Sequence, residues 1–176
     1  TTTRGDVNVG KGTAAGDNVT RNSAAASAEL GADGSSDITA SVIDLNAVTG
    51  IGVLAQLEIT GATISADTTN GTIDLNNSNA ASSTVSTITT GTGNISFNQT
   101  GGGNVTVQAA STVNGSITLT ALWNLIISGN LTSAGALAGI TLTADSESNG
   151  IGDLFINAGT VVSGGVGSIN LSGANA

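Results

Sequence analysis

Residues 115–121 read Gly-Ser-Ile-Thr-Leu-Thr-Ala, and residues 138–144 read Ala-Gly-Ile-Thr-Leu-Thr-Ala. In both stretches apolar and polar residues alternate after a glycine or another small residue. The same pattern, with apolar residues in the first and third positions, occurs at nine places in the chain: 43–45, 57–59, 73–75, 95–97, 105–107, 117–119, 140–142, 154–156 and 169–171. The middle residue is polar in all of them except 154–156, where it is Phe155. Because successive side chains of a strand point to opposite faces, this pattern predicts strands with one buried face.

The spacing of these strands predicts the fold class. The first apolar positions at 73, 95, 117 and 140 are 22, 22 and 23 residues apart. Periods in this range are typical of solenoid repeats. In a parallel β-helix (β-solenoid) each coil adds one strand to each face, and apolar side chains stack on those of the neighbouring coils. An antiparallel β-sandwich, whose strands recur every 8–12 residues or so, is the alternative.

The chain divides into two regions by pattern. Residues 1–37 are weakly patterned and are expected to form an N-terminal segment or cap, and residues 38–176 are expected to hold the solenoid repeats. Helix signals are poor because Thr, Asn, Ser and Gly are weak helix formers. The best helical candidates are residues 24–30 and 134–138.

Composition excludes most chemistry. The 176 residues include no His, Cys, Pro, Met or Tyr, and no Lys or Arg follows Arg21. An imidazole base, a thiolate nucleophile and a soft-metal site are therefore unavailable. Three basic residues against twelve acidic ones leave no patch for nucleic-acid phosphates. No apolar run approaches the ~18 residues of a membrane span. We expect neither an enzyme, nor a nucleic-acid partner, nor membrane insertion.

One acidic stretch is a candidate metal site. Oxygen-bearing side chains alternate at Asp145, Glu147 and Asn149, Gly150 follows, and a carbonyl at Ile151 and a carboxylate at Asp153 complete the set. This order is similar to the first nine positions of an EF-hand-like calcium loop. It departs from that pattern by a Glu at the third position and by lacking an acid at the twelfth. Calcium is the only cofactor that the sequence suggests, and a solvated acidic loop between coils is the alternative.

Aromatic and acidic side chains elsewhere in the chain are further candidates for binding. Trp123 and Phe155 are candidate interaction residues, with ordinary packing as the alternative. Asp44, Glu58 and Asp74 take the outward middle position of three strands. If those strands stack, their like charges repel; otherwise they point from different faces.

Four stretches carry a resemblance to a known family: residues 115–121, 129–135, 138–144 and 153–159. They resemble the repeat regions of large secreted bacterial proteins of the filamentous-haemagglutinin type, over roughly residues 38 to 176. The resemblance implies a right-handed parallel β-helix at the bacterial cell surface or outside the cell, as an adhesin shaft or a self-assembling filament or sheath subunit. Its partners are then copies of itself or adjacent repeats of a longer chain. A calcium-dependent module that binds glycans or a host receptor is the alternative, and ice binding through Thr arrays is a third.

Overall fold

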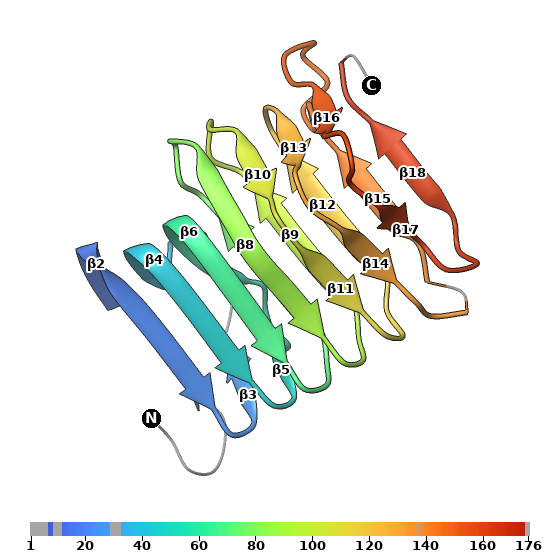
Figure 1. Cartoon of the computed structure of the whole chain (residues 1–176). Coiled ribbons are helices and arrows are strands. Elements are labelled where there is room, and N and C mark those ends of the chain that lie inside the picture. Colours follow the sequence, from blue (N-terminus) through green and yellow to red (C-terminus); the bar gives the residue numbers. More distant parts are fainter. Residues whose placement is uncertain (1–6, 9–11, 29–32, 137, 175–176) are drawn as a thin grey trace.

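The computed structural model describes residues 7–8, 12–28, 33–136 and 138–174, and these form a single stack of parallel strands (Figure 1). The described residues contain no helix, so the fold is an all-β parallel β-solenoid. The helix predicted at 24–30 is wrong, because Ala26–Ala28 is a strand, and the described residues of 134–138 are not helical either. The strands are β1 Val7–Asn8, β2 Gly12–Ser23, β3 Ala26–Ala28, β4 Ile38–Ala47, β5 Gly50–Ile51, β6 Leu57–Thr68, β7 Ile73–Asn77, β8 Ser83–Thr90, β9 Ile95–Gln99, β10 Val105–Val107, β11 Ala110–Thr112, β12 Ile117–Ala121, β13 Leu125–Ile127, β14 Leu131–Ser133, β15 Ile140–Thr143, β16 Leu154–Ile156, β17 Val162–Ser163 and β18 Ile169–Ser172.

The strands form three ladders that we call faces 1, 2 and 3. Face 1 contains β1, β3, β5, the start of β6, β7, β9, β12, β15 and β18. Face 2 contains β2, β4, β6, the end of β8, β11, β14 and β17. Face 3 contains the start of β8, β10, β13 and β16. A chain that visits faces 1, 3 and 2 in turn completes one coil and places the next coil directly above it.

Towards the N-terminus single long strands replace the separate strands of faces 3 and 2. The pairing of β4 with β2 and of β6 with β8 shifts register once in each case, between Ala14 and Asn18 and between Ile64 and Ser65. Such an irregularity bends a strand. The long strands can therefore pass from one face to the next without a turn.

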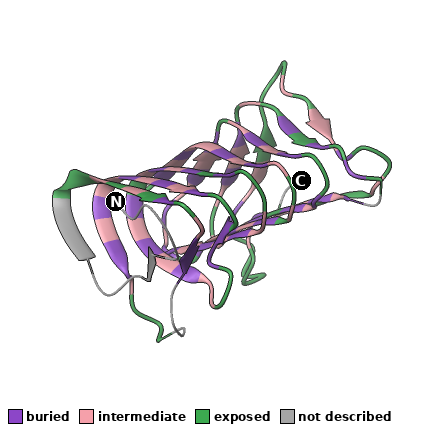
Figure 2. Cartoon of the chain, turned by 90° about the horizontal axis from the view of Figure 1, so that it is seen from below, coloured by how far each residue is buried: buried purple, intermediate pink, exposed green. Residues whose placement is uncertain are grey.

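Buried and outward residues alternate along the strands, as the sequence pattern predicted. The alternation is visible as purple and pink bands in Figure 2. Seven of the nine triplets have both apolar residues buried, those from 43–45 to 140–142. Their side chains form one continuous apolar core through the stack. The last two triplets, at 154–156 and 169–171, are not buried.

The corner between face 2 and face 1 repeats every 22 residues and depends on glycine. The Thr90 hydroxyl donates to the Gly71 carbonyl at 2.9 Å, and one coil later the Thr112 hydroxyl donates to the Gly93 carbonyl at 2.8 Å. A Cβ atom added to Gly115 would lie only 1.6 Å from the Gly93 carbonyl oxygen. Successive coils therefore approach too closely at this corner for any larger residue.

Amide side chains fill the core at the corner that follows β7 and β9. Asn77 and Gln99 are fully buried and in register, and the Asn77 Nδ2 donates to the Gln99 Oε1 at 2.8 Å. The Asn77 Oδ1 accepts from the Gly61 N–H at 2.9 Å, and its Nδ2 also contacts the Ser83 hydroxyl. These bonds satisfy polar groups that have no access to water, and they join three successive parts of the stack.

The sheet begins before residue 38. Strand β2 pairs with β4 from Gly12 to Ser23, and β3 pairs with β5. The ladder thus continues across the boundary between the two regions expected from the sequence. That residues 1–37 act as a cap stays a prediction.

Candidate functional site

The C-terminal end of the solenoid is an open edge. Strands β16, β17 and β18 pair on one side only, with β13, β14 and β15. Within the described residues no strand pairs with their other edges. Each edge strand therefore presents backbone N–H and C=O groups that can hydrogen-bond a further strand.

Apolar side chains that point along the core are uncovered at this end. Ile169 is in register with Ile140 and Leu171 with Leu142, which are fully buried. Ile169 is nevertheless 44% exposed and Leu171 47% exposed, because no described residues form a further coil above them. The other apolar residues with large exposure in this region are Ile151, Phe155, Ile156, Val161 and Val166.

The edge strands β16, β17 and β18 themselves contain no charged residue, although Asp153 directly precedes β16. No Asp, Glu, Lys or Arg occurs anywhere after Asp153. Exposed edges of soluble proteins are normally blunted by charged side chains, by proline or by a covering segment. None of the described residues pairs with the outer edge of β18.

Among the described residues at the N-terminal end of the stack, Arg21 has an unusual position. Arg21 of β2 is in register with Leu45, and its neighbour Val19 with Ile43. Leu45 and Ile43 are fully buried, so Arg21 occupies a core-facing position, and it is half-buried there. Burial lowers the pKa of the Arg21 guanidinium, and the negative charge of Asp37 partly offsets this. A charged residue that points inward at an edge is a known means of preventing edge-to-edge pairing.

Sequence reasoning missed the position of Arg21. It noted that the basic residues cluster near the N-terminus, but the face to which Arg21 points follows only from its register with β4. The alternation Val19-Thr20-Arg21-Asn22-Ser23 could have indicated this, since Val19 and Arg21 lie on one face of a strand.

The candidate calcium loop, residues 145–153, closes on itself. The two carboxylate oxygens of Asp145 accept from the N–H groups of Asn149 and Gly150, both at 3.0 Å. The Glu147 Oε1 accepts from the Asn149 Nδ2 at 2.6 Å, and the Asn149 Oδ1 accepts from the Ile151 N–H. Asp145 adopts a left-handed backbone conformation, with φ of 51°.

Asp153 lies apart from these bonds, at the start of β16. Its N–H donates to the side-chain oxygen of Asn124 in the coil below, at 2.7 Å. Across the described residues, no three acidic side chains are grouped as a metal ion requires. A calcium site at 145–153 stays a prediction.

Trp123 and Phe155 are both 45% exposed. Phe155 is in register with Ile126 on the outside of face 3. Trp123 lies in the turn between β12 and β13, close to Gly102 of the coil below: a Cβ added there would be 3.9 Å from the indole ring. Half of the indole is thus packed, and half is accessible to a partner.

The three outward acids of the sequence analysis do not stack on one another. Asp44 is opposite Ser65, Glu58 is opposite Asn76, and Asp74 is opposite Ser96. Ser65 donates its hydroxyl to Asp44 at 2.7 Å, and Gln56 donates its amide to Asp74 at 2.6 Å. Asp44 and Asp74 are therefore bonded to polar neighbours, whereas the Glu58 Oε2 is buried without a hydrogen-bond partner among the described residues. The three acids do not stack as a carboxylate pair.

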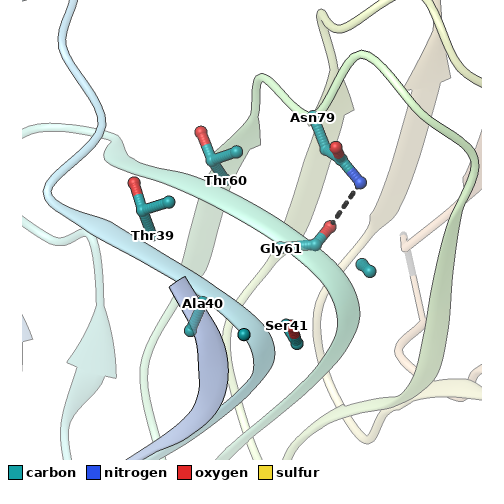
Figure 3. A pocket seen from close by; sticks show the side chains of 8 residues that line it. Thr39, Ala40, Ser41, Thr60, Gly61 and Asn79 are labelled. Carbon is teal, nitrogen blue, oxygen red and sulfur yellow. Dashed lines mark hydrogen bonds between the residues drawn. The ribbon is translucent and has the colours of Figure 1, made fainter. Parts of the chain in front are cut away.

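A shallow hollow of ≈240 Å³ lies beside the bends of β4 and β6. Figure 3 shows its small lining residues, with Asn79 donating to the Gly61 carbonyl at 3.2 Å. Thr39 and Thr60, in register on neighbouring strands, supply hydroxyls. No titratable side chain lines the hollow. It therefore offers no acid or base for catalysis.

Comparison of this chain with protein-family models, with curated proteins and with solved structures finds no match in any of the three. The β-solenoid fold is established by the structure, and the resemblance to filamentous-haemagglutinin-type proteins rests on the repeat motifs alone. In the part of the chain that the structure describes, no helix has the length and hydropathy needed to cross a bilayer.

Proposed function

We propose that this chain is a structural segment of a secreted bacterial cell-surface protein, an adhesin shaft or filament subunit whose β-solenoid continues by end-on stacking onto copies of itself or onto adjacent repeats of a longer chain. The observation that carries the proposal is the open edge of β16, β17 and β18, with Ile169 and Leu171 uncovered. A free solenoid requires a polar cap at each end. An end without one is suited to receive another coil.

The outside of the rod supports the same function. No charged residue occurs from residue 75 to residue 144. From β9 onward the outward ladders of face 1 consist of Ser, Thr and Asn, for example Ser96, Thr118, Thr141 and Asn170. Such a surface is wetted without strong self-repulsion, which favours assembly. A catalytic role is not part of the proposal.

Negative-stain electron microscopy together with small-angle X-ray scattering tests this function. We expect short straight rods that associate through their ends as concentration rises, with an unchanged cross-section. Compact particles of equal dimensions, or rods that associate side by side, would contradict the proposal. The Leu171→Lys variant should remain rod-shaped and lose end-on association, because it places a charge in the uncovered core.

A calcium-dependent module for glycans or a host receptor is the second candidate. Its support is the order of oxygen-bearing residues in the 145–153 loop and the exposed Trp123 and Phe155. Calcium dependence of binding to a glycan array would favour it over a passive shaft. Ice binding has less support, because Ser and Asn interrupt the Thr ladder of face 1 at Ser96 and Asn170.

A further inference from the structure

We propose that the loop at 145–153 modifies itself: the Gly150 nitrogen attacks the side chain of Asn149, which loses its amide, and Asp145 receives the proton of that nitrogen. The products are ammonia and an aspartate or isoaspartate at position 149. The inference goes beyond the proposed function, because it concerns a chemical reaction of the chain and holds whether or not the rod assembles.

The sequence contains three Asn–Gly pairs, at 70–71, 114–115 and 149–150. Glycine hinders attack of its own nitrogen on the preceding side chain least, because it has no Cβ and its backbone is the most permissive. The reaction inserts a five-membered ring into the main chain, so the backbone around the pair must have room to move. The surroundings of the three pairs therefore decide which of them can react.

Two of the pairs lie in corners where successive coils press together. A Cβ added to Gly71 would lie 2.0 Å from a carbonyl oxygen of the preceding coil, and one added to Gly115 would lie 1.6 Å from another. The Gly71 N–H donates to the Thr92 carbonyl of the next coil, and the Gly115 N–H donates to the buried Thr112 hydroxyl. Ring closure at either pair would require packed coils to separate.

The third pair lies in the loop between β15 and β16. Asn149 and Gly150 are both exposed, and Gly150 has a φ of 81°. Nothing in the described part of the chain lies within 4 Å of a Cβ added to Gly150. This pair can therefore change its backbone shape without separating two coils.

The loop also brings the reacting groups together. The Asn149 Oδ1 accepts from the Ile151 N–H at 2.8 Å, so the side-chain carbonyl folds back over the intervening Gly150 peptide. The Gly150 N–H donates to the Asp145 Oδ2 at 3.0 Å. A carboxylate that accepts this hydrogen bond is placed to take the proton as the nitrogen attacks. The Ile151 N–H stabilises the negative charge that develops on the Asn149 Oδ1.

Bonds and protons balance with water as the only further reagent. A bond forms between the Gly150 nitrogen and the Asn149 Cγ, and the bond between Cγ and Nδ2 breaks. The proton that leaves the Gly150 nitrogen ends on the departing nitrogen, which leaves as ammonia. Water then opens the cyclic imide at either of its two carbonyls. The result is aspartate or isoaspartate, with one added negative charge.

The product changes the loop. In the unmodified chain the Asn149 Nδ2 donates to the Glu147 Oε1 at 2.6 Å. A carboxylate at position 149 has no hydrogen to donate, so the same contact would bring two negative charges together. We expect the modified loop to open at this contact.

Incubation of the full chain at neutral pH tests the inference, with tandem mass spectrometry to identify each converted asparagine. A second sample in urea gives the rates with all three pairs unfolded, which should be similar. In the folded chain, position 149 should convert at least about tenfold faster than positions 70 and 114, because those two react only after local unfolding. Conversion at 149 should also be faster in the folded chain than in urea.

Two variants test the proton acceptor. Asp145→Asn should slow conversion at 149 at least about tenfold, because the carboxylate that takes the Gly150 proton is lost. The matched control Asp153→Asn removes the same charge at the far end of the loop and should convert at nearly the original rate. The pH dependence gives a second readout. With Asp145 as acceptor, the rate in the folded chain should rise less with pH than the rate in urea, where hydroxide removes the proton.

Conversion at 149 that is no faster than at 70 and 114, or that is slower in the folded chain than in urea, would overturn the inference, because the loop would then protect its amide. An Asp145→Asn variant that converts as fast as Asp153→Asn, with the pH dependence found in urea, would overturn the role of Asp145.

Discussion

Replacing Gly115 by alanine should destabilise the solenoid although glycine has no side-chain contact to lose. The cost comes from the added Cβ atom. The new Cβ would lie 1.6 Å from the carbonyl oxygen of Gly93 in the coil below. The same oxygen accepts the hydroxyl of the buried Thr112 at 2.8 Å. The two coils must separate locally, and that hydrogen bond must lengthen or break.

The magnitude follows from two contributions. Forcing an extra carbon into a packed site costs about 1–3 kcal/mol. Loss of the buried hydrogen bond from Thr112 adds about 0.5–1.5 kcal/mol. We therefore expect Gly115→Ala to lower the free energy of unfolding by about 2–4 kcal/mol.

Two other glycines separate steric overlap from backbone conformation. Gly150 has a positive φ of 81° and nothing within 4 Å of an added Cβ, so Gly150→Ala should cost only the left-handed conformation, about 1–2 kcal/mol. Gly102 has neither a positive φ nor a contact closer than 3.9 Å. Gly102→Ala should therefore change stability by no more than about 0.5 kcal/mol.

Urea unfolding followed by far-UV circular dichroism measures all three variants. Because solenoids unfold in units that couple to their neighbours, hydrogen exchange of the coils around residue 115 should accompany it. If Gly115→Ala unfolds within about 0.5 kcal/mol of Gly102→Ala, close approach of the coils is not what fixes glycine at this corner.

Three further predictions concern buried polar groups and the acidic loop. Asn77→Leu removes the partner of Gln99 and of the Gly61 N–H inside the core, so it should cost about 2–4 kcal/mol, and a cost below about 1 kcal/mol in urea unfolding would contradict the inner amide ladder. Burial raises the pKa of Asp37 above its ordinary value of 3.8, as it does for Asp67, where the charge of Asp44 adds to the effect. A raised carboxyl pKa contributes stability that is full below the unfolded-state value and is lost as pH rises through the folded-state value. Asp37→Asn should therefore weaken the pH dependence of the thermal midpoint between the unfolded-state and folded-state pKa values of Asp37. A pH dependence that is the same in the variant would count against the buried position of this carboxyl. Finally, the 145–153 loop is closed by its own hydrogen bonds, so a chelator should leave the thermal midpoint unchanged, whereas a midpoint that rises with calcium would support the calcium loop.

Much of the fold could be predicted from the sequence, because the two periods of the solenoid are both present in it. The alternation at 117–119 and 140–142 predicts strands, and the spacing of 22–23 residues predicts their stacking. The apolar–polar pattern does not predict the later strands of face 2. Strands such as Ala110–Thr112 and Leu131–Ser133 bury hydroxyl groups that donate to carbonyls, so an apolar–polar pattern does not mark them.

The candidate site could be predicted only in part. The absence of charged residues after Asp153 can be read from the sequence. Which side chains are uncovered there depends on the register of β18 with β15, and the inward position of Arg21 depends on the register of β2 with β4. Register is a property of neighbouring coils, and one sequence without its structure does not define it.

The central claim is that the described part of this protein is a stack of coils in fixed parallel register. An engineered disulfide between neighbouring coils tests this claim most directly. Thr118 and Thr141 are opposed on β12 and β15. Neighbouring strands are ~4.8 Å apart, within the separation of about 4.4–6.8 Å between Cα atoms that a disulfide spans. We predict that the Thr118→Cys, Thr141→Cys variant closes readily within one chain under mild oxidation. The control Thr118→Cys, Asn170→Cys, two strands apart, should not close. A control that closed as readily as the adjacent pair, or an adjacent pair that stayed open, would contradict the account.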